Sequence, residues 1–378
     1  MNGQAGFPGG HFPPPKGEKP HANQKRAVFS SFRGENSALP NRCGAGVLSA
    51  ALALSLLLGG CGLVRDRHAL EQLRPAETLG YDRLPDGTVL LSAAVGAPED
   101  ETLTLTGTGQ DLRKAMEALK QALGEGELFL PNIRYVLCGE AAAREGLGEL
   151  LDYVLRDEGL GLGMELLLLR GTAADTVTAE DPAVSEALRA ALAGLPDDRF
   201  RSSFRETVLR LREDGAAPVR LLEVRREGDA AALVCAGLGI LRDGALAGTV
   251  TGHAAEAAEA LLGCSADAVR RLGGQSLACT LSPCAFRTEP EGVRMTVRVR
   301  VTSQTGESGR GAAERALQDA VERETAEVLR LSQELGADWL GLGRALRREA
   351  GADPETWLSG LDVSVTAKIE WESEDDTQ

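Results

Sequence analysis

Histidine and aromatic residues are scarce in this chain, which limits the chemistry that it can support. Of its 378 residues, four are histidines and 4% are aromatic. His11 and His21 lie near the N-terminus, and His253 is expected to cap a helix or to lie on the surface. A metal centre or a Cys/His nucleophilic pair needs convergent imidazole or thiolate ligands. The sequence therefore predicts no catalytic residues, no metal site and no enzymatic activity.

The paired cysteine spacing of a zinc site is also missing, although the chain has seven cysteines. Cys279 and Cys284 are separated by four residues and are too isolated to supply such a site. Together with Cys138, Cys235 and Cys264 they are expected to be buried apolar residues. For an exported chain, a disulfide between Cys279 and Cys284 is the alternative.

Positive charge is in deficit, since 41 basic residues stand against 56 acidic ones and the net charge is −15. The first 60 residues hold six Lys or Arg and two acids, so the remaining 35 basic and 54 acidic residues carry −19. A body of this charge is repelled by phosphate backbones, which argues against nucleic acid as a partner. Anionic headgroups repel it too, so membrane attachment requires a covalent or inserted anchor.

The apolar run at residues 45–58 is too short to cross a membrane. It has 14 residues, whereas a bilayer of roughly 30 Å needs about 20. Basic residues precede the run and a pair of glycines follows it, which is the pattern of a secretory signal peptide. A buried core helix is the alternative interpretation.

The end of this run resembles a lipobox, the motif at which a diacylglyceryl group joins a cysteine before cleavage. Its residues are Leu58, Gly59, Gly60 and Cys61. The small glycines let an extended backbone enter a narrow peptidase cleft, and the Cys61 thiol takes the lipid. The predicted product carries diacylglyceryl and N-acyl chains on Cys61, needs no other cofactor, and is held outside a membrane by its lipid.

Hydrophobic periodicity predicts a multi-domain fold of the mixed α/β (α+β) class, with mixed or antiparallel sheets flanked by helices. Strands are expected at 77–82 and 88–95 around the Pro85-Asp86-Gly87 turn, and at 133–138, 164–169, 230–241, 244–250, 276–281, 293–301 and 361–371. Helices are expected at 111–123, 141–153, 181–193, 254–262 and, as a long helix near the C-terminus, 312–335. A strand is also expected near 207–211 and a domain boundary or exposed loop at 215–218. The last strand is expected to complete the sheet begun near residue 230.

The chain is expected to divide into five parts. They are the leader and signal peptide (1–60), a tether and short helix (61–76), an N-terminal α/β region (77–215), a C-terminal α/β domain (219–372) and an acidic tail (373–378). Arg156 and Asp157 end the predicted helix of the N-terminal region. They are interpreted as a helix C-terminal charge pair, with contact to a partner protein as the alternative.

Four segments, in order behind the lipobox, resemble the Ger(x)C family, the C-subunit lipoproteins of spore germinant receptors. They are Leu79-Gly80-Tyr81-Asp82 with Asp86-Gly87, residues 128–146 with Ala143-Arg144-Glu145-Gly146, Leu151–Asp157, and Gln333–Gly343 with its Ala337-Asp338 pair. The sequence departs from the family at Gly62-Leu63, where Trp-Asp usually follows the lipid cysteine, and it matches poorly at 172–218.

This resemblance implies a subunit of a nutrient-sensing complex at the outer face of the spore inner membrane. Its partners would be the integral-membrane A and B subunits of the receptor, and its role would be assembly or signal relay. The first alternative is a solute-binding lipoprotein of a transporter, but regular βαβ alternation is absent through 180–310. The second is an anchored envelope hydrolase, which the lack of a Gly-x-Ser-x-Gly elbow opposes.

Overall fold

The computed structural model describes residues 73–96, 102–157, 159–179, 181–193, 200–289, 292–306, 309–350 and 363–372. The described residues all belong to one compact unit, Arg67–Gln378. In this described part, every helix is too short or too polar to cross a bilayer. The predicted signal peptide and Cys61 lie outside the described residues.

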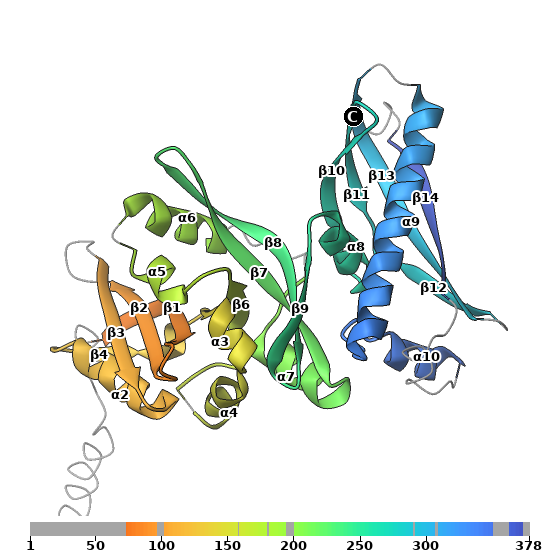
Figure 1. Cartoon of the computed structure of the whole chain (residues 1–378). Coiled ribbons are helices and arrows are strands. Elements are labelled where there is room, and N and C mark those ends of the chain that lie inside the picture. The colour runs from red at the N-terminus through yellow and green to blue at the C-terminus, as the bar shows by residue number, and fades with distance from the viewer. Residues whose placement is uncertain are drawn as a thin grey trace, which may run out of the picture. The chain divides into compact units, whose positions relative to one another are not determined.

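A nine-stranded sheet organises the first part of this unit. Its strands are β1 (Leu73–Arg83), β2 (Val89–Gly96), β3 (Thr102–Gly109), β4 (Glu127–Phe129), β5 (Tyr135–Gly139), β6 (Glu165–Leu169), β7 (Ala216–Glu227), β8 (Ala230–Arg242) and β9 (Ala245–Thr251). They lie in the order β3-β2-β1-β5-β6-β7-β8-β9, with β4 beside β1. Figure 1 shows β1, β2 and β3 at one end of this sheet and the long strands β7, β8 and β9 at the other. The central pairs from β1 through β5 and β6 to β7 are parallel, so both faces of the sheet must be covered.

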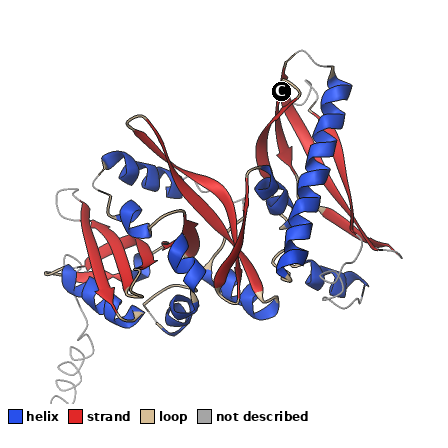
Figure 2. Ribbon diagram, in the orientation of Figure 1, coloured by secondary structure: helices blue, strands red, loops and turns tan. Residues whose placement is uncertain are grey.

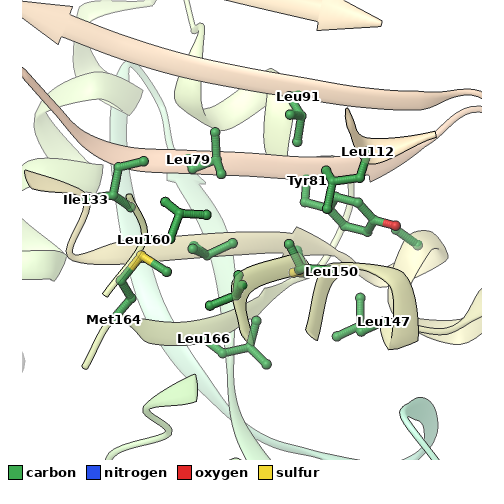
Figure 3. Packing of buried hydrophobic residues seen from close by; sticks show 14 of the residues in the cluster. Leu79, Tyr81, Leu91, Leu112, Ile133, Leu147, Leu150, Leu160, Met164 and Leu166 are labelled. Carbon is green, nitrogen blue, oxygen red and sulfur yellow. The ribbon is translucent and has the colours of Figure 1, made fainter. Parts of the chain in front are cut away.

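Side chains alternate along each strand, so both faces of the sheet present apolar residues. Helices cover both faces and form one core on each side. One face carries α2 (Leu112–Ala122), α3 (Glu140–Glu145), α4 (Gly148–Arg156) and α7 (Phe204–Glu213), and the other carries α5 (Ala173–Val177) and α6 (Pro182–Ala193). On β6, Leu166 enters the first core and Leu167 the second. Figure 3 shows the first core, in which Tyr81 of β1 lies near Leu112 of α2 and Leu150 of α4.

A five-stranded sheet follows, with a helical layer on one face. Its strands are β10 (Ala266–Leu272), β11 (Gln275–Leu281), β12 (Ala285–Glu289), β13 (Gly292–Thr305) and β14 (Val363–Trp371), and the helices are α8 (His253–Leu261), α9 (Arg310–Leu335) and α10 (Leu342–Ala350). The strands lie in the order β10-β11-β13-β12, and β14 runs parallel to β13. Val297 and Val299 of β13 pack with Leu317 of α9, the long helix beside this sheet in Figure 2.

A further core cluster takes residues from both sheets. Ile240 of β8 packs in it with Val328 of α9, Met295 of β13 and the fully buried Trp339. Shared burial of this kind makes the two sheets parts of one folded unit, Arg67–Gln378.

The predicted mixed α/β class is confirmed, and so are the elements with strong local signals. The β1–β2 hairpin turns at Gly87, whose φ is +83°, and the Thr88 amide donates to Asp86 Oδ1 at 2.9 Å. Asp111 caps α2 by accepting from the Lys114 amide at 2.8 Å. The long helix and the alternating strand β13 also form as predicted.

Four sequence predictions about individual elements are wrong. Residues 207–211 lie in the helix α7, which the Ser203 side chain caps. Residues 216–218 begin strand β7 rather than a loop. The helix expected at 141–153 breaks into α3 and α4 at Gly146, where φ is +120°. The last strand pairs with β13, whereas β8 belongs to the first sheet.

The described residues also bear on the segmentation and the cysteines. Leu73 already begins β1, so residues 73–76 of the expected tether form a strand. The nine-stranded sheet contains strands from both sides of position 215. The division into 77–215 and 219–372 stays a prediction. Cys138 and Cys279 are buried, but Cys235 is exposed and Cys264 and Cys284 are partly exposed. No disulfide joins Cys279 and Cys284 in the structure.

Candidate functional site

Arg156 and Asp157 stand where the sequence places them, at the end of α4, but they do not pair with each other. Both Nε and an NH₂ nitrogen of Arg156 contact Asp152 Oδ1, at 3.0 and 2.9 Å, one turn earlier on the helix. Asp157 instead accepts from the Gly159 amide at 2.7 Å. The expected charge pair is therefore replaced by an i,i+4 pair and a C-terminal turn.

The two residues line a hollow of about 650 Å³ between α2 and α4, here called the α2–α4 groove. Its lining is polar and carries five carboxylates and three cations: Asp111, Leu112, Arg113, Lys114, Glu117, Glu149, Asp152, Tyr153, Arg156 and Asp157. Sequence reasoning found the α4 side and missed the α2 side. The charged positions of α2 carry no motif, and only the packing of the two helices brings them together.

Glu149 joins three elements at this groove. One of its oxygens accepts from the Leu112 amide at the start of α2, and the other accepts from Arg83 of β1, both at 2.6 Å. A carboxylate at a helix N-terminus also interacts favourably with the helix dipole. Glu149 therefore fixes the position of α2 relative to α4 and gives the groove a defined width.

Tyr153 supplies the groove with a half-buried aromatic ring. Burial, reinforced by the neighbouring Asp157 carboxylate, raises the pKa of Tyr153 to about 12. The phenol therefore stays protonated at neutral pH. Tyrosine and arginine are the residue types that most often dominate protein interfaces, and Tyr153 and Arg156 share this wall.

No group of three or more His, Cys, Asp or Glu in the described part of the chain is arranged to hold a metal ion. What the groove offers instead is a set of charged hydrogen-bonding groups around one aromatic ring. Such a surface is suited to contact with a protein segment of alternating charge.

The residues that carry the family resemblance have structural roles. Both oxygens of the buried Asp82 accept from amides at the start of α5, those of Ala173 and Ala174, at 2.8 Å each. Gly80 is required beside it because a Cβ there would lie 2.1 Å from the Ser92 hydroxyl. The Gly-Tyr-Asp segment thus holds a helix against the sheet.

Asp338 likewise accepts hydrogen bonds from backbone amides at the start of a helix, α10. Its two oxygens accept from the amides of Leu342 and Gly343 at 2.8 and 2.7 Å. Burial raises the pKa of Asp338 to about 6, although the two amide hydrogen bonds oppose this rise. The neighbouring Gly341 has φ +75°, a backbone conformation that a side chain would strain.

Asp338 should therefore impose a measurable pH dependence on stability. Its folded pKa of about 6 lies above the ordinary value of 3.8, so its favourable contribution is complete below about pH 4 and is lost as the pH rises through 6. A shift of about two units corresponds to roughly 3 kcal/mol. In urea unfolding of wild type and Asp338→Asn, the stability advantage of wild type should fall by about that amount between pH 4 and 7.

The exposed Asp86 is the control for this measurement. Hydrogen bonding to Thr88 lowers the pKa of Asp86, so Asp86→Asn should not remove the loss of stability that Asp338 causes at rising pH. Parallel stability curves for wild type and Asp338→Asn would contradict the role given to Asp338.

The fold and the groove define a class of protein: a mixed α/β module with a charged groove between two of its helices. Residues 66–194 match the family model described as the spore germination protein N-terminal domain. Over these residues the match confirms the resemblance seen in the sequence to the Ger(x)C family, the C-subunit family of spore germinant receptors. This family is associated with membranes in spores.

Two further comparisons concern solved structures and curated sequences. Among solved structures, the crystal structure of the GerBC protein is 15% identical to this chain, with a TM-score of 0.47, and the match covers 77% of this chain and 96% of that one. A search of curated protein sequences finds no match.

Proposed function

We propose that this protein is the membrane-anchored lipoprotein subunit of a nutrient germinant receptor, acting in spore germination through assembly or signal relay. In this proposal, acyl chains on Cys61 hold it at the outer face of the spore inner membrane, beside the integral-membrane A and B subunits. The observation that carries the proposal is the order of two features. The match to the spore germination protein N-terminal domain begins at residue 66, five positions after the end of the Leu58-Gly59-Gly60-Cys61 segment.

The α2–α4 groove is the proposed contact for one of these subunits. Arg156 is largely exposed and lies beside Tyr153 and three carboxylates of α4 and its C-terminal turn. An exposed i,i+4 pair contributes little to folding, so Arg156 is available for a stronger contact in a complex. The groove walls lie on two helices fixed by Glu149, which limits the ordering that binding requires.

A deletion strain tests the function and the contact together. Deletion should impair nutrient-triggered germination and leave growth intact. Complementation with Arg156→Glu should reduce the A and B subunits recovered by co-purification from spore membranes by roughly tenfold, as expected for reversing a charged interface contact. Subunits would be identified by mass spectrometry.

Arg189→Glu is the matched control for this variant. Arg189 lies on α6, has a side-chain exposure of 73% against 77% for Arg156, and also forms a surface ion pair within one helical turn. It should complement the deletion fully. Normal germination of the deletion strain would refute the proposed function, whereas equal recovery with both variants would refute the groove contact alone.

A further inference from the structure

The outer face of the five-stranded sheet gathers positive charge in an otherwise acidic protein. A shallow hollow of about 350 Å³ lies on β12, β13 and β14 and is lined by Ala285, Arg287, Arg294, Thr296, Arg298, Thr366 and Lys368. This set, here called the basic face, holds four cations and no carboxylate. The residues of this face that lie on β13 alternate with Val297 and Val299. These two valines point to the opposite side of the sheet and pack with α9.

The register of the strands places like charges directly opposite each other. Arg298 of β13 lies opposite Lys368 of β14, and Arg287 of β12 lies opposite Arg294 of β13. Like charges at such positions destabilise a sheet. Within the described residues, Arg287, Arg298 and Lys368 have no ion pair with a carboxylate. The arrangement is unfavourable for the isolated protein and becomes favourable when an anionic surface covers it.

From this arrangement we infer that the basic face docks onto the anionic headgroup layer of a phospholipid membrane. The face spreads its cations over three strands of a sheet, and its largest apolar side chain is Ala285. A protein partner would be expected to engage buried aromatic or aliphatic anchors. A layer of phosphate headgroups is attracted by clustered Lys and Arg alone.

This inference rests on the proposed function, which places the protein at a membrane, and it adds an orientation to it. The net negative charge of the whole chain does not prevent the contact. Charges are screened over about 8 Å at physiological ionic strength, so the membrane responds to the nearest residues rather than to the total. The lipid supplies attachment, and the basic face decides which side of the protein faces the headgroups.

Vesicle sedimentation tests the inference without the lipid anchor. The protein is the mature chain from residue 61 with Cys61→Ser, which contains the complete unit Arg67–Gln378. Vesicles of equal parts phosphatidylglycerol and phosphatidylcholine are compared with pure phosphatidylcholine vesicles. The chain should bind the anionic vesicles, and binding should weaken with added salt. Reversing Arg298 and Lys368 together, each to Glu, should weaken binding by at least about 25-fold, since each lost cation accounts for roughly fivefold.

Lys120→Glu with Arg205→Glu is the matched control. These two residues are exposed on α2 and α7, away from the basic face, and their reversal changes the net charge by the same amount. The control should bind like wild type. Equal weakening in both double variants, or absence of binding to anionic vesicles by wild type, would overturn the inference. Because no acyl chain is present, neither result bears on the lipoprotein assignment.

The single variant Lys368→Glu separates docking from folding. It replaces a repulsive cross-strand pair by an attractive one with Arg298, so the melting temperature should rise by about 1–3 °C. Vesicle binding should fall at the same time. An unchanged affinity with a raised melting temperature would show that the face does not contact lipid. Retained vesicle binding with lost recovery of a receptor subunit would identify a protein interface instead, and would also overturn the inference.

Discussion

Replacing Cys61 by alanine is expected to abolish acylation and to release the protein from the membrane fraction. The thiol is the only atom of the predicted lipobox that can take the diacylglyceryl group. One acyl chain gives marginal, reversible binding, whereas two or more anchor a protein stably. Mass spectrometry of the wild-type protein should therefore find an N-terminal peptide that begins at acylated Cys61.

The leader complicates this measurement and determines its design. Without lipid on residue 61 the leader should stay attached, and its apolar run at 45–58 could hold the chain at the membrane. Fractionation is therefore done with Cys61→Ala exported behind a conventional signal peptide, and the membranes are washed at high salt to screen the contact of the basic face with headgroups. Under these conditions this form should move almost entirely to the soluble fraction.

Cys43→Ala, in the native leader, is the matched control and should be acylated and retained like wild type. Finding wild-type protein with its leader intact in the cytosol would contradict the lipoprotein assignment.

Replacing Arg270 by alanine should cause the largest loss of stability among single substitutions in the C-terminal sheet. The Arg270 side chain is 1% exposed and contacts Glu256 of α8 at 2.8 Å and Glu324 of α9 at 2.7 Å. Removing one partner of a buried ionic group leaves uncompensated charge and is expected to cost about 3–5 kcal/mol. The free energy of unfolding at neutral pH, measured in urea, should fall by that amount.

Acid should partly rescue this variant. Burial raises the pKa of Glu324, and Arg270 at present opposes that rise. Without the guanidinium, Glu324 should protonate more readily, so the stability deficit should shrink as the pH falls towards 5.

The triple variant Arg270→Met, Glu256→Gln, Glu324→Gln is the control, because it removes all three charges together. It should recover most of the lost stability. A single-variant loss below about 1 kcal/mol would mean that the cluster is not desolvated as its burial implies.

Local signals explain the elements that the sequence predicted correctly. The Pro85-Asp86-Gly87 turn, the Asp111 cap and the alternation of β13 each depend on residues a few positions apart. The failures arose where local signals conflict. Thr207 and Val208 favour a strand by propensity, but Ser203 caps a helix there, and their burial in α7 decides the outcome.

The candidate site was only half predictable for the same reason. Arg156 and Asp157 belong to a recognisable segment, and the sequence placed them at a helix end. The pairing of Arg156 with Asp152 depends on helix geometry, and the α2 wall of the groove depends on packing across many intervening residues.

By itself, the sequence determined the resemblance to a family, the fold class and the lipobox that predicts a lipid anchor at Cys61, because each depends on residue order and short-range spacing. Only the tertiary structure decided which strands pair, which charges meet and where the basic face lies. Arg287, Arg298 and Lys368 are scattered over more than 80 positions of an acidic chain and become neighbours through strand register alone. Register is set by burying one face of each strand, a collective condition that no local segment encodes.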